Sequence, residues 1–149
     1  MTSSVNQSKG LEGVVAAETR LSDVRGETGE LVYCGYNINE LAGSVSFEEV
    51  VHLLFENRLP NQAELASLKA SLAASRALPT GVLDILRSLP ASTPPMHVLR
   101  TGISALGCFD ADADNPEPSV AKQKALQLIS QIPVVTAAFH RMRQGKPVL

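Results

Sequence analysis

The residue types that most often do chemistry are dispersed along this chain. Three histidines, His52, His97 and His140, fall on three separate predicted helices, and none lies two to four residues from another histidine or a cysteine. A zinc site needs nitrogen and sulfur ligands that converge, and general acid–base catalysis needs a group within hydrogen-bond reach of the reacting atoms. We therefore predict no metal site and assign no catalytic residue within this sequence.

Asp110, Asp112 and Asp114 alternate along the chain like the first ligands of a calcium-binding loop. Such a loop needs glycine at its sixth position and a bidentate glutamate at its twelfth. This sequence has Asn115 and Ala121 at those positions, so the stretch predicts an acidic, proline-containing loop and no calcium site.

The two cysteines, Cys34 and Cys108, are far apart in the sequence, which indicates two reduced, partly buried thiols rather than a disulfide. The sequence also lacks a glycine-rich phosphate-binding loop and the G-x-S-x-G motif of a nucleophilic serine. Residue chemistry alone therefore shows no self-contained active site.

The composition predicts a single, mainly helical domain with an aliphatic core. The chain has 149 residues, of which 44% are hydrophobic and only 4% aromatic. Its net charge of −2 and the lack of a basic cluster argue against a nucleic-acid partner. No apolar run reaches the roughly 18 residues of a membrane span, so no membrane partner is expected. The polar N-terminus lacks the apolar core of a signal peptide, so we expect a cytoplasmic protein with a disordered leader over residues 1–10.

Residues 11–149 are expected to form one domain that starts with a β-hairpin spanning residues 13–34. The predicted strands, 14–20 and 30–33, carry β-branched and aromatic residues and flank a glycine-containing turn. A short helical turn follows over 38–42. Because a two-stranded hairpin is marginal alone, it must lie on something larger.

A succession of helices is predicted for the rest of the chain, residues 46–144. Ser46 and Glu49 have the spacing of a capping box at the start of the first of them. Proline and glycine separate the segments that follow. Helices are expected over 47–55, 61–76, 82–89, 94–107 and 119–144.

The last two predicted helices, 94–107 and 119–144, have apolar residues three or four apart on one face and small residues on another. This pattern is typical of a helix inside a helix layer or at a subunit contact. Thr93 and Ser119 are the predicted caps at their starts. Pro133 removes one backbone hydrogen bond within the second helix, so we expect a kink beside it.

Three stretches, in this order, resemble the opening part of citrate synthases. Residues 33–42, YCGYNINELA, resemble the family's Y-R-G-Y-x-I-x-E-L-A segment. Residues 47–54, FEEVVHLL, with the leucine–proline pair that follows, are similar to F-E-E-V…L-L…L-P. Residues 95–106, PMHVLRTGISAL, are close to the family's P-M-D-V-L-R-T-A-V-S-A-L. The sequence departs from the family at Cys34, Asn57, Pro94 and His97, where Arg, Gly, His and Asp are usual.

The resemblance implies a mainly α fold, namely the multi-helical large-domain portion of a citrate synthase with a small N-terminal β-hairpin, incomplete at its C-terminus. It also implies an acyltransferase of the tricarboxylic acid cycle that condenses acetyl-CoA with oxaloacetate to give citrate and CoA. In the family, two histidines and one aspartate do this chemistry from a later region that begins with an H-G-x-x-N segment. That segment is absent here, so we expect the chain to be inactive alone. The alternatives are a 2-methylcitrate synthase, which uses propionyl-CoA, and a non-catalytic helical dimerisation module.

The resemblance further implies a homodimer, in which helices 94–107 and 119–144 pack against the same pair of a second subunit. A second partner would be the missing C-terminal portion, as a continuation of the chain or as a separate chain. Lys9 lies near the place where some members carry a basic residue that contacts the phosphates of the cofactor, and it is the candidate residue for binding acetyl-CoA. Six apolar side chains would divide between the core and the dimer contact: Leu99, Ile103, Leu106, Ile129, Ile132 and Val135.

Overall fold

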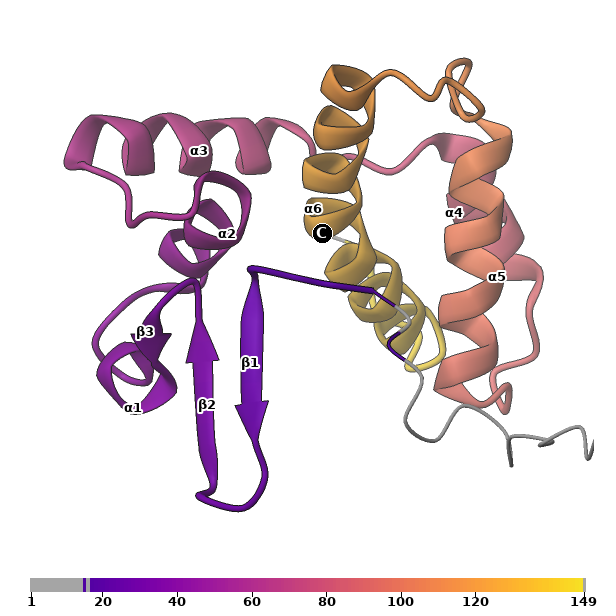
Figure 1. Ribbon diagram of the computed structural model, residues 1–149. Helices are drawn as coiled ribbons and strands as arrows, with labels where there is room; N and C mark the ends of the chain where they lie inside the picture. Colours follow the sequence, from indigo (N-terminus) through magenta and orange to yellow (C-terminus); the bar gives the residue numbers. More distant parts are fainter. Residues whose placement is uncertain (1–14, 16, 149) are drawn as a thin grey trace, which may run out of the picture. The chain divides into compact units, whose positions relative to one another are not determined.

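The structure is a computed structural model of the chain and describes residue 15 and residues 17–148 (Figure 1). The predicted leader over residues 1–10, with Lys9, lies outside the described residues. The chain divides into two compact units, Met1–Asn61 and Gln62–Leu149. Within the described residues, the first unit holds a small sheet and two helices, and the second holds four helices.

The first unit contains an antiparallel sheet of three strands in the order β1 (Ser22–Arg25), β2 (Glu30–Tyr33) and β3 (Tyr36–Asn37). The prediction of a first strand over 14–20 is wrong for residues 15 and 17–20, because the strand that pairs with β2 starts at Ser22. Residues 14 and 16 lie outside the described residues. The pairing of β1 with β2 starts next to the predicted turn, where Arg25 lies opposite Glu30, and continues away from the turn as far as Ser22 and Tyr33. Since β2 ends at Tyr33, the last residue of β1 that it pairs is Ser22.

A second tight turn, which the sequence pattern did not predict, joins β2 to β3. Cys34 and Gly35 have φ angles of 46° and 91°, and Tyr33 pairs with Tyr36 across them. Two successive left-handed residues are typical of the hairpin turns whose twist matches that of the strands. The backbone N–H of Cys34 also donates to Leu21 O at 3.0 Å, which extends the β1–β2 pairing by one bond.

Two helices follow in the first unit, α1 (Ile38–Leu41) and α2 (Phe47–Glu56). The predicted capping box of α2 is confirmed: Ser46 Oγ accepts from Glu49 N–H, and Glu49 Oε2 accepts from Ser46 N–H at 2.6 Å. The helix ends at Asn57, whose φ of 57° is left-handed. Such a conformation suits glycine, the residue that the family resemblance places there.

The second unit consists of α3 (Gln62–Ala74), α4 (Thr80–Ser88), α5 (Pro95–Cys108) and α6 (Pro118–Met142). The last three helices pack against one another and supply the buried core, while α3 contacts α6 (Figure 1). The core is aliphatic apart from one aromatic ring, as the composition predicts. Its buried members are Val82, Leu86, Val98, Ala105, Leu106, Val135, Ala138 and Phe139.

The helices α5 and α6 approach closely where α5 carries a glycine. A Cβ built on Gly102 would lie 2.5 Å from Val135 Cγ1. Val135 itself is fully buried. The small face predicted for this helix therefore serves, at Gly102, the contact with α6 inside the same chain.

The predicted caps of α5 and α6 are wrong. Pro94 and Glu117 occupy the cap positions in extended conformations, and no side chain caps either helix there in the described residues. Each of them precedes a proline, and the residue before proline is sterically disfavoured in the α region. The helices therefore begin at Pro95 and Pro118, where the missing N–H costs nothing.

Pro133 lies inside α6, as predicted, and the axis of this helix changes direction along its length in Figure 1. Its ring cannot donate the backbone hydrogen bond that Ile129 O would otherwise accept. Across residue 15 and residues 17–148, every helix is too short or too polar to cross a lipid bilayer.

Candidate binding groove between α5 and α6

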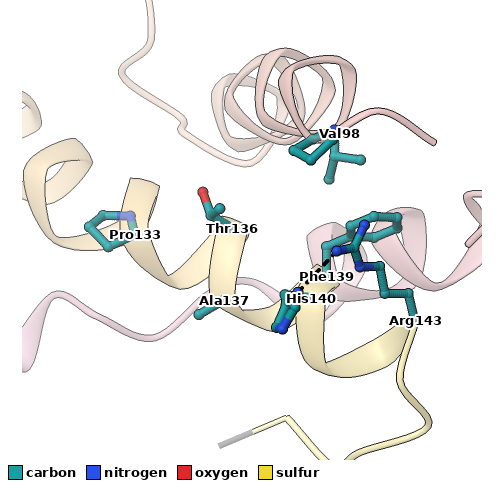
Figure 2. Close-up of a pocket in the computed structure, with 8 residues that line it drawn as sticks. Val98, Pro133, Thr136, Ala137, Phe139, His140 and Arg143 are labelled. Atoms are coloured by element: carbon teal, nitrogen blue, oxygen red, sulfur yellow. Dashed lines mark hydrogen bonds between the residues drawn. The ribbon is translucent and has the colours of Figure 1, made fainter. Parts of the chain in front are cut away.

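A groove of about 540 Å³ lies where the start of α5 faces the second half of α6 (Figure 2). Pockets that take small molecules or side chains commonly have volumes of about 300–1,000 Å³, so this groove is large enough for a ligand. Its lining residues are Pro95, Val98, Pro133, Thr136, Ala137, Phe139, His140 and Arg143.

The groove exists because the side chains on one face of α6 are mostly small or compact and leave space beside α5. Pro133 lies three and four residues before the adjacent pair Thr136 and Ala137, and His140 lies four and three residues after them, so all four share one face of the helix (Figure 2). The first three are small or compact. Val98 lies opposite on α5, and the floor that results is almost entirely apolar.

Basic groups form the polar rim of the groove. Arg143 Nη2 lies 3.3 Å from His140 Nδ1, and because a guanidinium can only donate, Nδ1 is the acceptor and Nε2 carries the ring proton (Figure 2). The N-terminal end of α5 at Pro95 adds the positive end of a helix dipole. No carboxylate lines the groove in the part of the chain that the structure describes.

The chemistry open to this arrangement is recognition rather than catalysis. Apolar walls bind apolar groups by excluding water, and a cationic rim favours an anionic end on the same ligand. A covalent mechanism would need a nucleophile next to a base. Among the eight lining residues the hydroxyl of Thr136 is the candidate nucleophile and His140 the candidate base. Thr136 Oγ1 donates instead to Ile132 O at 3.2 Å, and His140 Nδ1 faces Arg143, so in the described residues the two groups are not arranged as such a pair.

A second, smaller pocket of about 200 Å³ lies between the end of α5 and the first half of α6, and a half-buried ion pair lines it. Lys124 Nζ lies 3.2 Å from Asp110 Oδ2 and is shielded from solvent. The backbone N–H of Asp112 donates to Asp110 Oδ1 at 2.9 Å. This hydrogen bond and the neighbouring ammonium lower the pKa of the Asp110 carboxyl. Asp110 thus belongs to an ion pair that ties the predicted acidic loop to α6.

The three histidines lie on separate helices, as predicted, and only His140 lines the groove. His52 on α2 donates from Nδ1 to Arg58 O at 3.0 Å, just beyond the end of that helix. His97 is exposed near the start of α5. In the described ranges, no three His, Cys, Asp or Glu side chains come together as a metal site would require. Both cysteines are free, but the prediction that both are partly buried is wrong for Cys108, which is exposed.

The six predicted contact residues fall into two groups. Leu106 and Val135 are buried in the core of this chain. Leu99, Ile103, Ile129 and Ile132 are half-buried, so part of each side chain stays available to a partner. The sequence pattern did not single out the groove, because its two walls are more than thirty residues apart along the chain. The spacing of Pro133, Ala137 and His140 was a signal that could have indicated it.

Comparisons with known proteins place this fold in a family. A family model described as "Citrate synthase, C-terminal domain" matches residues 10–149. The chain is 43% identical over 141 residues to the citrate synthase of Haloferax volcanii, covering 92% of this chain and 37% of that protein. It is 41% identical over 143 residues to the citrate/2-methylcitrate synthase of Bacillus subtilis, covering 95% and 38% respectively. The crystal structure of citrate synthase from Pyrobaculum aerophilum superposes with a TM-score of 0.85 at 32% identity, over 94% of this chain and 37% of that one.

The chain therefore spans 37–38% of the length of these curated relatives. Within that portion the likeness covers the sheet of the first unit and the helices of the second. The predicted mainly α fold is confirmed, with the predicted small N-terminal β-hairpin extended by a third short strand, and the predicted family is confirmed as well. The chain belongs to the citrate synthase family.

Proposed function

We propose that the chain is the N-terminal, helical scaffold portion of an acyltransferase that condenses acetyl-CoA with oxaloacetate to give citrate and CoA. The observation that carries the proposal is identity of 41–43% to synthases of this kind over more than nine-tenths of the chain. The order of the three sequence motifs supports an N-terminal position, because they resemble the opening part of the family's sequences. Two cysteines without a disulfide fit a reducing compartment, and we place the enzyme in the cytoplasm.

Catalysis itself would reside in the remaining portion of the parent enzyme. In the groove the Thr136 hydroxyl donates to Ile132 O rather than to His140, and Lys124 is engaged with Asp110 in an ion pair. The catalytic segment implied by the resemblance is absent from this sequence. The role of these 149 residues is then to hold the catalytic portion in place and to form the subunit contact. Acetyl-CoA would be a substrate of the assembled enzyme, and Lys9 stays the candidate for contact with its phosphates.

The subunit contact is proposed to use α5 and α6. Leu99, Ile103, Ile129 and Ile132 are half-buried within the chain, so a second copy could cover the rest of their apolar surface. Leu106 and Val135 would support this contact from the core side.

A chimeric enzyme tests the proposal. The matched portion of the Bacillus subtilis citrate/2-methylcitrate synthase is replaced by this chain, and release of the CoA thiol is followed with acetyl-CoA and oxaloacetate. We expect turnover by the chimera and none by the chain alone. Turnover by the chain alone would show that catalytic groups lie within it, and a folded but inactive chimera would favour a non-catalytic dimerisation module.

The same assay distinguishes the two substrate classes. The name of the Bacillus subtilis relative includes both citrate and 2-methylcitrate, so the family likeness leaves both acyl donors open. Comparison of kcat/KM for acetyl-CoA and propionyl-CoA in the chimera, with the unsubstituted relative as control, shows whether this portion changes the preference.

A further inference from the structure

We infer that the groove between α5 and α6 is the docking site for an apolar segment that carries an acidic residue, supplied by the remaining portion of the parent enzyme. The inference rests on the proposed function, since it needs a remaining portion. It identifies the surface of this chain through which that portion is held and the chemistry of the segment that fits it.

The shape and the apolar lining of the groove favour its occupation by apolar side chains rather than by water. Val98 and Phe139 are buried members of the core and form part of the floor, while Pro133 and Ala137 leave it open from the α6 side (Figure 2). An apolar concavity of about 540 Å³ gains free energy when side chains replace the water in it. The occupant is therefore apolar where it meets this floor.

The rim adds a charge requirement. Arg143, the Nε2–H of His140 and the positive end of α5 all lie at the edge of the groove, and no carboxylate among the described residues lines it. A carboxylate at the edge of the occupant would complete this arrangement with a charge-assisted hydrogen bond to Arg143. The occupant thus combines apolar side chains with an aspartate or glutamate.

The same charges disfavour a second copy of this chain as the occupant. A two-fold contact centred on the groove would bring the basic rims of the two copies together. In contrast, the solved Pyrobaculum aerophilum relative keeps this fold as 37% of its chain, at a TM-score of 0.85. Within one chain of such an enzyme, most of the polypeptide that can surround this portion is therefore the rest of the same chain.

The experiment compares one substitution in two settings, the isolated chain and the chimeric enzyme described above. Ala137→Trp fills the groove, whereas Ala121→Trp is the matched control, since Ala121 is an exposed alanine of α6 outside the groove. If the remaining portion occupies the groove, Ala137→Trp lowers the midpoint of thermal unfolding of the chimera by several degrees. The same substitution leaves the isolated chain unchanged, and Ala121→Trp changes neither.

Charge reversal tests the acidic partner. Arg143→Glu is expected to destabilise the chimera, and Lys146→Glu, an exposed lysine outside the groove, is the control. Added salt should reduce the difference between the two variants, because it screens a charge pair at the rim.

A chimera that tolerates Ala137→Trp as well as it tolerates Ala121→Trp overturns the inference. A loss of stability that appears in the isolated chain and grows with its concentration would assign the groove to a second copy instead. If the chimera does not fold, overlapping peptides that tile the unmatched part of the Bacillus subtilis relative are tested against the isolated chain by fluorescence anisotropy. Absence of any peptide whose affinity falls about tenfold or more with Ala137→Trp then counts against the inference.

These outcomes are separate from those of the proposed function, which is judged by turnover of the unsubstituted chimera. An active chimera that tolerates Ala137→Trp contradicts the docking site and leaves the proposed activity intact. An inactive chimera whose stability depends on Ala137 contradicts only the proposed activity.

Discussion

At the scale of single residues, Gly102 sets how closely α5 and α6 approach. A Cβ there would lie 2.5 Å from Val135 Cγ1, while a Cβ at Gly107 on the same helix would meet nothing within 4 Å. We expect Gly102→Leu to lower the free energy of unfolding by about 1–3 kcal/mol, because overpacking outweighs the gain in helix propensity. Gly107→Leu, the control, should raise it by up to about 1 kcal/mol. Urea unfolding followed by circular dichroism measures both, and equal effects would contradict the close approach.

Asp110 gives stability a dependence on pH. The hydrogen bond from Asp112 N–H and the Lys124 ammonium lower the pKa of this carboxyl, so its contribution is present above the ordinary pKa of 3.8. The contribution is lost as the pH falls through the lowered pKa. We therefore expect Asp110→Asn to destabilise the chain at neutral pH and to approach the wild type under acidic conditions. Urea midpoints across this range test it, and a pH-independent difference would contradict the prediction.

At the scale of elements, the capping box decides where α2 begins. Ser46 Oγ and Glu49 Oε2 satisfy backbone N–H groups that the helix cannot pair itself. Ser46→Ala should cost about 0.5–2 kcal/mol of local stability, seen as faster amide hydrogen exchange at Glu49. Ser44→Ala, an exposed serine outside the helix, is the control. Unchanged exchange at Glu49 would show that other contacts hold this helix start.

The same scale explains why two caps were mispredicted. Thr93 and Ser119 have suitable side chains, but the Pro94–Pro95 and Glu117–Pro118 steps decide where each helix starts. The steric restriction on the residue before proline outweighs the gain from one capping hydrogen bond. Both effects could be read from the sequence, and at these two helix starts the restriction before proline is stronger than the preference for a capping side chain.

At the scale of the whole molecule, the proposed dimer makes a prediction about oligomeric state. We expect the chain to sediment as a dimer, and Ile132→Glu to weaken dimerisation by at least about tenfold, because it places a charge in an apolar contact. Val120→Glu, a half-buried residue near the start of α6, is the control. A monomeric wild-type chain, or equal effects of both variants, would count against the contact.

The helices, the first hairpin turn and the capping box of α2 could be predicted from the amino-acid sequence, because each depends on residues a few positions apart. The family could also be predicted from the sequence, because its motifs and their order can be recognised without a structure. The start of β1 could not be predicted in this way, since it depends on which residues β2 can pair with. Only the tertiary structure separated Leu106 and Val135, which are buried in the core, from Leu99 and Ile132, which are half-buried. It alone brought Val98 opposite Ala137 to form the groove, because packing joins residues that the chain order keeps apart.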